Sequence, residues 1–224
     1  VPGLAGPASH RTAAPGPDMS DLGIHRPSTL AVLDAIRVAG SASRVEVAGK
    51  TGLTQATVSN SVRELLDQGL VVETGERTKT RGKPRTLLRL DPRARCAIGV
   101  QLSSDSVSVV AIDTFGSVLA KTRLPGVARL DPDHTVDRIA AAVDALITTT
   151  GLARDRFVGL GVAAPGVHNR ASGVIRESRS LPQWIGLDIR DMIAQRTGFA
   201  TILENDATTA AVGDFWGGGL PGAR

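Results

Sequence analysis

Apolar residues recur at helical spacing in three consecutive segments of the first third of the chain. The first segment starts at Pro27 and stops at Gly40, which predicts one helix between them. Ser43 and Thr54 are good N-cap residues, and each precedes a further apolar run, the second of which stops at Gly69. The sequence therefore predicts three helices, whose apolar positions are Leu30, Leu33, Ile36, Val45, Val47, Ala48, Val58, Val62, Leu65 and Leu66.

Two short strands are predicted after the third helix, over 71–72 and 87–90, and a basic segment joins them. The order of helix, helix, turn, helix and two-stranded wing is the winged helix-turn-helix arrangement, which we predict over residues 25–92. The alternative is a plain three-helix core that binds nothing. Thr, Ser and Asn at outer positions of the third helix, together with the basic hairpin, favour DNA binding over that alternative.

The second half of the chain alternates strands and helices in a different order. Three strands are predicted first, over 97–100, 107–112 and 118–120. The later elements are predicted as a helix over 135–149, a strand over 158–163, a helix near 187–197, a strand over 201–203 and a helix from about Ala207. Three strands followed by these elements are typical of the ribonuclease H-like half-domain of actin and sugar kinases. The predicted fold class is therefore α+β and α/β, a winged helix-turn-helix followed by such a half-domain.

Composition excludes several classes of protein. Hydrophobic residues make up 42% of the 224 residues, which is enough for a core. Residues 1–24 are rich in Pro, Gly, Ala and Ser, which predicts a disordered tail without a secretory signal. No apolar run approaches the roughly 18 residues of a membrane span, so we expect a cytoplasmic protein. The single cysteine, Cys96, is expected in the core, and the four histidines show no metal spacing, so no metal or cofactor is expected.

The positive charge of the chain lies almost entirely in the predicted winged helix-turn-helix. Residues 25–90 hold eleven Lys and Arg against six Asp and Glu, a net charge of +5. Residues 1–24 carry a net charge of −1, and residues 91–224 carry none, which together give the +4 of the whole chain. A basic block of this size beside a neutral domain is the charge distribution of a nucleic-acid-binding module on a partner domain.

The third helix is expected to enter the major groove of DNA. With Val58 and Val62 facing the core, a step of 100° per residue turns three others, Thr57, Asn60 and Glu64, outward. Gln55 and Asn60 can each pair with an adenine edge, at about 1–3 kcal/mol of discrimination, although a merely solvated polar residue is the alternative at any one position. The helical residues expected to bind DNA are Arg44, Thr54, Gln55, Thr57, Ser59, Asn60 and Arg63.

The wing carries a second set of cations. Gly82 and Pro84 keep the strip between the two strands narrow and extended, which suits a narrow A·T-rich minor groove. The wing residues expected to bind DNA are Lys79, Arg81, Lys83 and Arg85.

Three motifs in the second half resemble one known family. They are the glycine-rich run over 159–166, the segment from Ser178 to Trp184, and the run Glu204, Asn205, Asp206, Ala207. Together they resemble the ROK family of repressors and sugar kinases, over about residues 28–219. With the winged helix-turn-helix in front, the chain is similar to the xylose-repressor and N-acetylglucosamine-repressor branch of that family.

The resemblance implies a sugar site. Asn205 and Asp206 match the pair that holds a sugar hydroxyl in the kinases, where the Asp acts as base, and Gly166 would approach the same sugar by its backbone. An Asp that caps the following helix is the rival interpretation of Asp206. His168, two residues after Gly166, is expected to be a solvated loop residue rather than a sugar contact. The implied partners are operator DNA, a small sugar or sugar phosphate and a second copy of the chain, as a homodimer or higher homo-oligomer.

The chain departs from the kinase pattern in two places. In the loop that cradles ATP phosphates in the kinases, Gln101 replaces the Asp and two serines, Ser103 and Ser104, replace the glycines. Arg179 and Ser180 replace a usual Pro-Asn pair. Residues 93–224 are expected to form only the first ROK subdomain, without the second. We therefore expect a sugar-responsive regulator of carbohydrate genes, a repressor rather than an enzyme. The alternatives are a sugar kinase with a DNA-binding extension, and a truncated DNA-binding protein without a working sensor.

Overall fold

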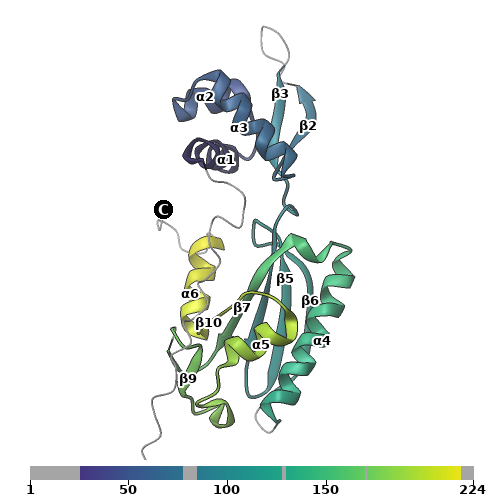
Figure 1. Ribbon diagram of the computed structural model, residues 1–224, viewed down its shortest axis with the longest axis vertical. Helices are drawn as coiled ribbons and strands as arrows, with labels where there is room; N and C mark the ends of the chain where they lie inside the picture. Colours follow the sequence, from purple (N-terminus) through teal and green to yellow (C-terminus); the bar gives the residue numbers. More distant parts are fainter. Residues whose placement is uncertain (1–25, 78–84, 128–129, 170, 218–224) are drawn as a thin grey trace, which may run out of the picture.

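The computed structural model describes residues 26–77, 85–127, 130–169 and 171–217, and it places them in two domains (Figure 1). A small helical domain with a short sheet is followed by a larger domain built on a five-stranded sheet. One connection, over residues 91–95, joins the two domains. Among the described residues, no helix is both long and apolar enough to cross a membrane.

The first domain is a winged helix-turn-helix, as predicted. All three predicted helices are present, and Ser43 and Thr54 cap the second and third as expected, but the sheet has three strands in the order β1-β3-β2 rather than two. The extra strand, β1, is only two residues long and pairs with β3, so it has no alternating pattern that the sequence could display. The elements are α1 (Pro27–Ala39), β1 (Ala42–Ser43), α2 (Arg44–Thr51), α3 (Gln55–Asp67), β2 (Val71–Arg77) and β3 (Thr86–Leu90).

The core of this domain forms where α3 packs against α1 and the sheet. Val58, Val62 and Leu65 on one face of α3 are fully buried, and so are Ile36 of α1 and Leu88 of β3. The spacing of the three α3 residues puts them on a single helical stripe, so α3 is oriented by its own apolar periodicity. The opposite face of α3 is left for solvent or a partner.

A capping box starts α2. The Ser43 hydroxyl accepts a hydrogen bond from the Glu46 backbone N–H, and the Glu46 carboxylate accepts from the Ser43 backbone N–H at 2.7 Å. The carboxylate also accepts from the Ser43 hydroxyl at 2.9 Å. These bonds favour the charged carboxylate, so the Ser43 backbone N–H and then its hydroxyl lower the pKa of Glu46 below its ordinary value.

We expect Ser43→Ala to lower the free energy of unfolding of the first domain by about 1 kcal/mol at neutral pH, the usual effect of losing an N-cap. A carboxylate with a lowered folded pKa stabilises above its unfolded pKa, and this contribution is lost as pH falls through the folded value. Part of the Ser43→Ala loss should therefore disappear in acid. Urea unfolding at neutral and acidic pH measures this difference, with Ser41→Ala, an exposed neighbour, as the control. A loss that is the same at both pH values would contradict the role of Glu46.

The second domain has a mixed sheet in the order β10-β7-β4-β5-β6. The strands β4, β5 and β6 are antiparallel neighbours, whereas β7 and β10 run parallel to β4. Two helices, α4 and α5, pack on one face of this sheet, and α6 extends from β10 toward the first domain (Figure 1). The elements are β4 (Cys96–Leu102), β5 (Ser106–Ile112), β6 (Val118–Pro125), α4 (Pro132–Thr150), β7 (Phe157–Ala164), α5 (Ile189–Thr197), β10 (Thr201–Asn205) and α6 (Asp206–Gly217).

This domain contains the predicted strands and helices, with each strand one to five residues longer than predicted and with two further differences. The helix α4 begins three residues earlier than predicted, because the Asp131 side chain accepts from the His134 N–H and Pro132 occupies the first turn. A hairpin of β8 (Val167–Asn169) and β9 (Val174–Glu177) lies where the sequence predicted only a loop. Cys96 is buried as expected, and burial raises the pKa of its thiol.

The connection between the domains is fixed to both of them by hydrogen bonds. On one side, the Asp91 N–H donates to the Leu70 carbonyl at 3.0 Å. On the other side, the Thr114 N–H donates to the Pro92 carbonyl at 2.9 Å, and the Thr114 hydroxyl donates to the Arg95 carbonyl at 2.8 Å. Thr114 belongs to the turn between β5 and β6. A displacement of this hairpin would therefore be passed directly to the connection.

Candidate DNA interface and sugar site

Four exposed residues form a stripe along α3, on the side opposite its buried face. They are Ala56, Asn60, Arg63 and Asp67, and we call them the α3 stripe. Three are polar or charged, and Ala56 has only a methyl group. The sequence predicted Asn60 in this orientation, and the structure confirms it. Ala56 was not among the expected DNA contacts, because it has no donor, acceptor or charge.

Thr57 and Glu64, which the sequence predicted to face outward, are half-buried instead. The Glu64 carboxylate accepts a hydrogen bond from the Thr29 hydroxyl of α1 at 3.0 Å. The Thr57 and Thr54 hydroxyls lie 2.9 Å apart, and the Thr54 hydroxyl accepts from the Thr57 N–H as the N-cap of α3. Glu64 therefore ties α3 to α1, and Thr54 and Thr57 fix its first turn, while the α3 stripe stays exposed.

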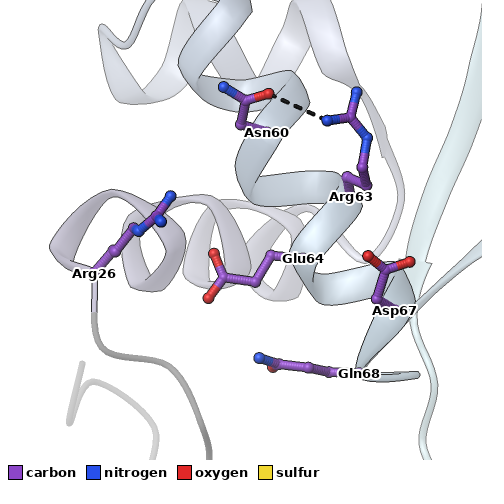
Figure 2. Close-up of a pocket in the computed structure, with 6 residues that line it drawn as sticks. All are labelled: Arg26, Asn60, Arg63, Glu64, Asp67 and Gln68. Atoms are coloured by element: carbon purple, nitrogen blue, oxygen red, sulfur yellow. Dashed lines mark hydrogen bonds between the residues drawn. The ribbon is translucent and has the colours of Figure 1, made fainter.

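A shallow polar groove of about 400 Å³ lies between the start of α1 and the C-terminal half of α3 (Figure 2). Figure 2 shows Arg63 beside Asn60, and its guanidinium donates to the Asn60 side-chain oxygen at 3.5 Å. Two carboxylates, Glu64 and Asp67, also line the groove, together with Arg26 and Gln68. The positive charge of α3 is thus offset by acidic side chains toward its C-terminal end.

The other expected DNA contacts lie in different surroundings. Gln55 is exposed at the first position of α3, and Ser59 is half-buried. The Arg44 guanidinium forms an ion pair with Glu73 of β2, with 3.0 Å between nitrogen and oxygen. Exposed pairs of this kind contribute about 0–1 kcal/mol, so a phosphate could replace the carboxylate at little cost. Of the wing residues, Arg85 is exposed before β3, whereas Lys79, Arg81 and Lys83 lie outside the described residues.

The structure brings together the three residues of the expected sugar site. The Asn205 amide nitrogen donates to the Gly166 carbonyl at 2.8 Å. The Asn205 side-chain oxygen accepts from the N–H groups of Ala207 and Thr208, at 2.9 and 3.2 Å. Asn205 therefore caps α6, and the Asp206 carboxylate also accepts from the Ala207 N–H at 2.9 Å, so both side chains bind the first turn of α6. Asp206 is the first residue of α6 and is half-buried.

Gly166 sits where no other residue fits. Its φ is +124°, and a Cβ atom added to it would lie 2.2 Å from the Glu177 carbonyl oxygen and 3.0 Å from the Ser178 Cβ. The close approach lets the turn after β7 pack against the segment that begins at Ser178. All three family motifs of the sequence thus meet at the C-terminal ends of β7 and β10, the edge where α/β sheets bind ligands.

His168 is not the solvated loop residue that we expected. It lies on β8, and both of its ring nitrogens are buried. Burial lowers the pKa of His168, while Glu204, the Pro165 carbonyl and Asp206 act in the opposite direction. The imidazole is therefore buried close to Glu204 and Asp206, and sequence reasoning missed its burial because β8 is only three residues long.

The turn that replaces the kinase phosphate loop is closed by its own hydrogen bonds. The Ser103 N–H donates to the Ser106 carbonyl at 3.0 Å, and the Asp105 N–H donates to the Ser103 hydroxyl at 3.4 Å. The Ser103 carbonyl accepts from the Val127 N–H at 3.2 Å. A phosphate cradle needs backbone N–H groups that point at the ligand, and two of the N–H groups here are already engaged. Within the described ranges, no cluster of His, Cys, Asp and Glu could hold a metal ion.

Two family models match the chain, one on each domain. A winged helix-turn-helix DNA-binding model matches residues 26–72, and a ROK family model matches residues 97–221. In three dimensions, the chain is similar to a ROK family transcriptional regulator described as a homolog of the E. coli MLC protein. The TM-score is 0.62 at 21% identity, over 88% of this chain and 48% of that one. This likeness shows that the two share a fold.

Relatives by sequence differ in how much of the chain they match. An uncharacterized protein of Sinorhizobium fredii is 34% identical over 77% of this chain and 44% of its own length. The xylose repressor of Caldicellulosiruptor bescii is 24% identical over 79% of this chain and 44% of its own length. The glucokinase of Thermotoga maritima is 30% identical, but over only 54% of this chain and 37% of its own length.

This chain spans about half the length of the curated relatives that it matches most fully. The relatives named as repressors align with more than three quarters of it, and so with much more than its second domain. The ROK family model alone matches more than half of its 224 residues, over 97–221. The chain belongs to the ROK family.

Proposed function

We propose that this chain is the operator-binding and sugar-sensing part of a transcriptional regulator, a repressor of carbohydrate genes. The observation that carries the proposal is a winged helix-turn-helix with an exposed polar stripe on α3, joined by a fixed connection to a ROK domain. The repressor relatives, which match most of the chain, support the same conclusion. The regulator would act in the cytoplasm on operator DNA, as a homodimer or higher homo-oligomer.

On DNA, α3 would enter the major groove by its N-terminal end. Gln55 and Asn60 are exposed and can each form two hydrogen bonds with an adenine edge. Arg63 and Arg44 would hold phosphates and set the position of the helix, and Ser59 would make a phosphate or thymine-methyl contact. Thr54 and Thr57, although engaged in the cap, stay close enough to the surface for phosphate contacts. The wing, with Lys79, Arg81, Lys83 and Arg85, would follow the minor groove.

The effector would be a small sugar or sugar phosphate, bound by Gly166, Asn205 and Asp206. The Asn205 side-chain nitrogen and oxygen both form hydrogen bonds within the protein. Asp206 and the backbone of the Gly166 turn would therefore make the direct contacts with the sugar. Sugar lowers operator affinity only if it binds the two states of the regulator unequally. The connection at Thr114 supplies a route by which the second domain would change the placement of α3.

We propose no phosphoryl transfer by this chain. The internal hydrogen bonds of the turn over 103–106 support this, since they occupy two N–H groups that a nucleotide phosphate would need. An assay for ATP-dependent phosphorylation over a panel of monosaccharides tests the point. Turnover of any sugar would overturn the proposal of a regulator that is not an enzyme and would favour a sugar kinase with a DNA-binding extension.

Operator binding should depend on salt with a slope set by the number of phosphates that the protein neutralises. We expect replacement of Lys79, Lys83 and Arg85 by Ala to flatten the slope by roughly one unit for each phosphate that is no longer neutralised. Duplexes enriched from a random pool, titrated at several salt concentrations, provide the measurement. Replacing three exposed cations elsewhere, Lys121, Arg176 and Arg93, changes the net charge equally and should leave the slope almost unaltered. An unchanged slope in the wing variant would contradict a wing on DNA.

A further inference from the structure

We propose that Ala56 is a base-reading residue and that its methyl group contacts the 5-methyl group of a thymine in the major groove. The proposal rests on the DNA-binding function proposed above and names a base that the operator must contain. Ala56 lies in the first turn of α3, directly after Gln55 and four residues before Asn60, and its side chain is exposed.

The position of Ala56 on the helix makes it central to the expected contact. The fully buried Val58, Val62 and Leu65 face the core, and the α3 stripe lies on the opposite side. At the start of α3, the Thr54 and Thr57 hydroxyls bind each other, and the Thr54 hydroxyl also accepts from the Thr57 backbone N–H. The exposed side chains left to face a groove in the first two turns are therefore Gln55, Ala56 and Asn60.

Charge restricts DNA to this end of α3. Asp67 is exposed on the α3 stripe and Glu64 lines the groove beside it (Figure 2), so the last turn of the helix, beyond Arg63, presents carboxylates to any phosphate that approaches. These carboxylates repel the DNA phosphates, whereas the first turn of α3 has no acidic residue. The helix would thus dock by its first two turns, with Ala56 near their centre.

The chemistry of Ala56 selects the base. A methyl side chain offers no hydrogen bond, and thymine is the one base that presents an apolar methyl group in the major groove. A side chain this small also lets the helix backbone approach the base edges, which brings Gln55 and Asn60 within reach of them. Ala56 and Asn60 are one helical turn apart, about 6 Å. We therefore expect the thymine within about two base-pair steps of an adenine bound by Asn60.

Removal of the thymine methyl group tests the proposal directly. Operator duplexes are first enriched from a random pool with the 224-residue chain, and each thymine is then replaced singly by deoxyuridine, which lacks the methyl group. We expect one replacement in each half-site to weaken binding about fourfold, the effect of removing one buried methyl group. In Ala56→Gly the same replacement should have no effect, because the two methyl groups no longer meet.

Ala31→Gly is the matched control. Ala31 is an exposed alanine of α1 in the same domain, so glycine there loosens a helix without touching the α3 stripe. This variant should keep the fourfold difference between thymine and deoxyuridine. Equal binding of all deoxyuridine duplexes by the unmodified chain, or a persistent difference in Ala56→Gly, would overturn the role of Ala56 while leaving DNA binding intact. A pool from which no sequence is enriched would overturn the proposed function itself.

Discussion

Gly166→Ala is expected to unfold the second domain at much lower urea concentration than the unmodified chain. Its Cβ would lie 2.2 Å from the Glu177 carbonyl oxygen, so β8 and β9 would have to move apart. Overpacking of this kind costs about 1–3 kcal/mol, and a side chain at φ +124° adds about another 1–3 kcal/mol of backbone strain. The shift would also displace the Gly166 carbonyl from the Asn205 amide and weaken the cap of α6.

Tryptophan fluorescence reports on the unfolding of the second domain alone, because both tryptophans, Trp184 and Trp216, belong to that domain. Gly116→Ala separates strain from collision. Gly116 has a φ of +81°, but nothing lies within 4 Å of its added Cβ, so only the strain should be observed. Equal losses in the two variants would contradict the close approach at Gly166. Operator binding should survive in both, since the first domain has its own core.

The sequence predicted the helices well because their apolar periodicity is long enough to measure. It could not decide which flank of α3 would be covered. Thr57 and Glu64 lie on one side of Asn60 on a helical wheel, and Ala56 and Arg63 lie on the other, so both flanks are about equally far from the centre of the predicted apolar stripe, which includes Leu66. Packing of α1 decided between them, through the hydrogen bond from Thr29 to Glu64. A contact between residues 35 positions apart leaves no trace in local spacing.

At the expected sugar site, the sequence could not predict which residue caps α6 or that His168 is buried. The residues that meet there were found from the three motifs, and the structure confirms that Gly166, Asn205 and Asp206 lie together. Asn205 and Asp206 are both good N-cap residues, so composition could not choose between them. The choice was made by β10, which runs to Asn205 and leaves no loop before α6. The burial of His168 likewise depends on a three-residue strand with no readable alternation.

Trp184→Ala is expected to destabilise the second domain by about 3–5 kcal/mol, since the indole is fully buried in its core. The indole N–H adds a second, unusual expectation, because it is buried without a hydrogen-bond partner among the described residues. An unsatisfied buried donor costs about 1–3 kcal/mol. Trp184→Phe removes this donor together with part of the ring, so the relief should offset much of the weakened packing.

Urea unfolding followed by circular dichroism gives both values, because it does not depend on the tryptophan that is removed. We expect Trp184→Phe to cost well under half as much as Trp184→Ala. A phenylalanine variant as unstable as the alanine variant would show that the N–H is satisfied, for example by a bound water, and that its removal is as harmful as the cavity. A small loss of stability would instead show that the segment from Ser178 to Trp184 is held in the second domain by apolar packing rather than by polar contacts of the indole.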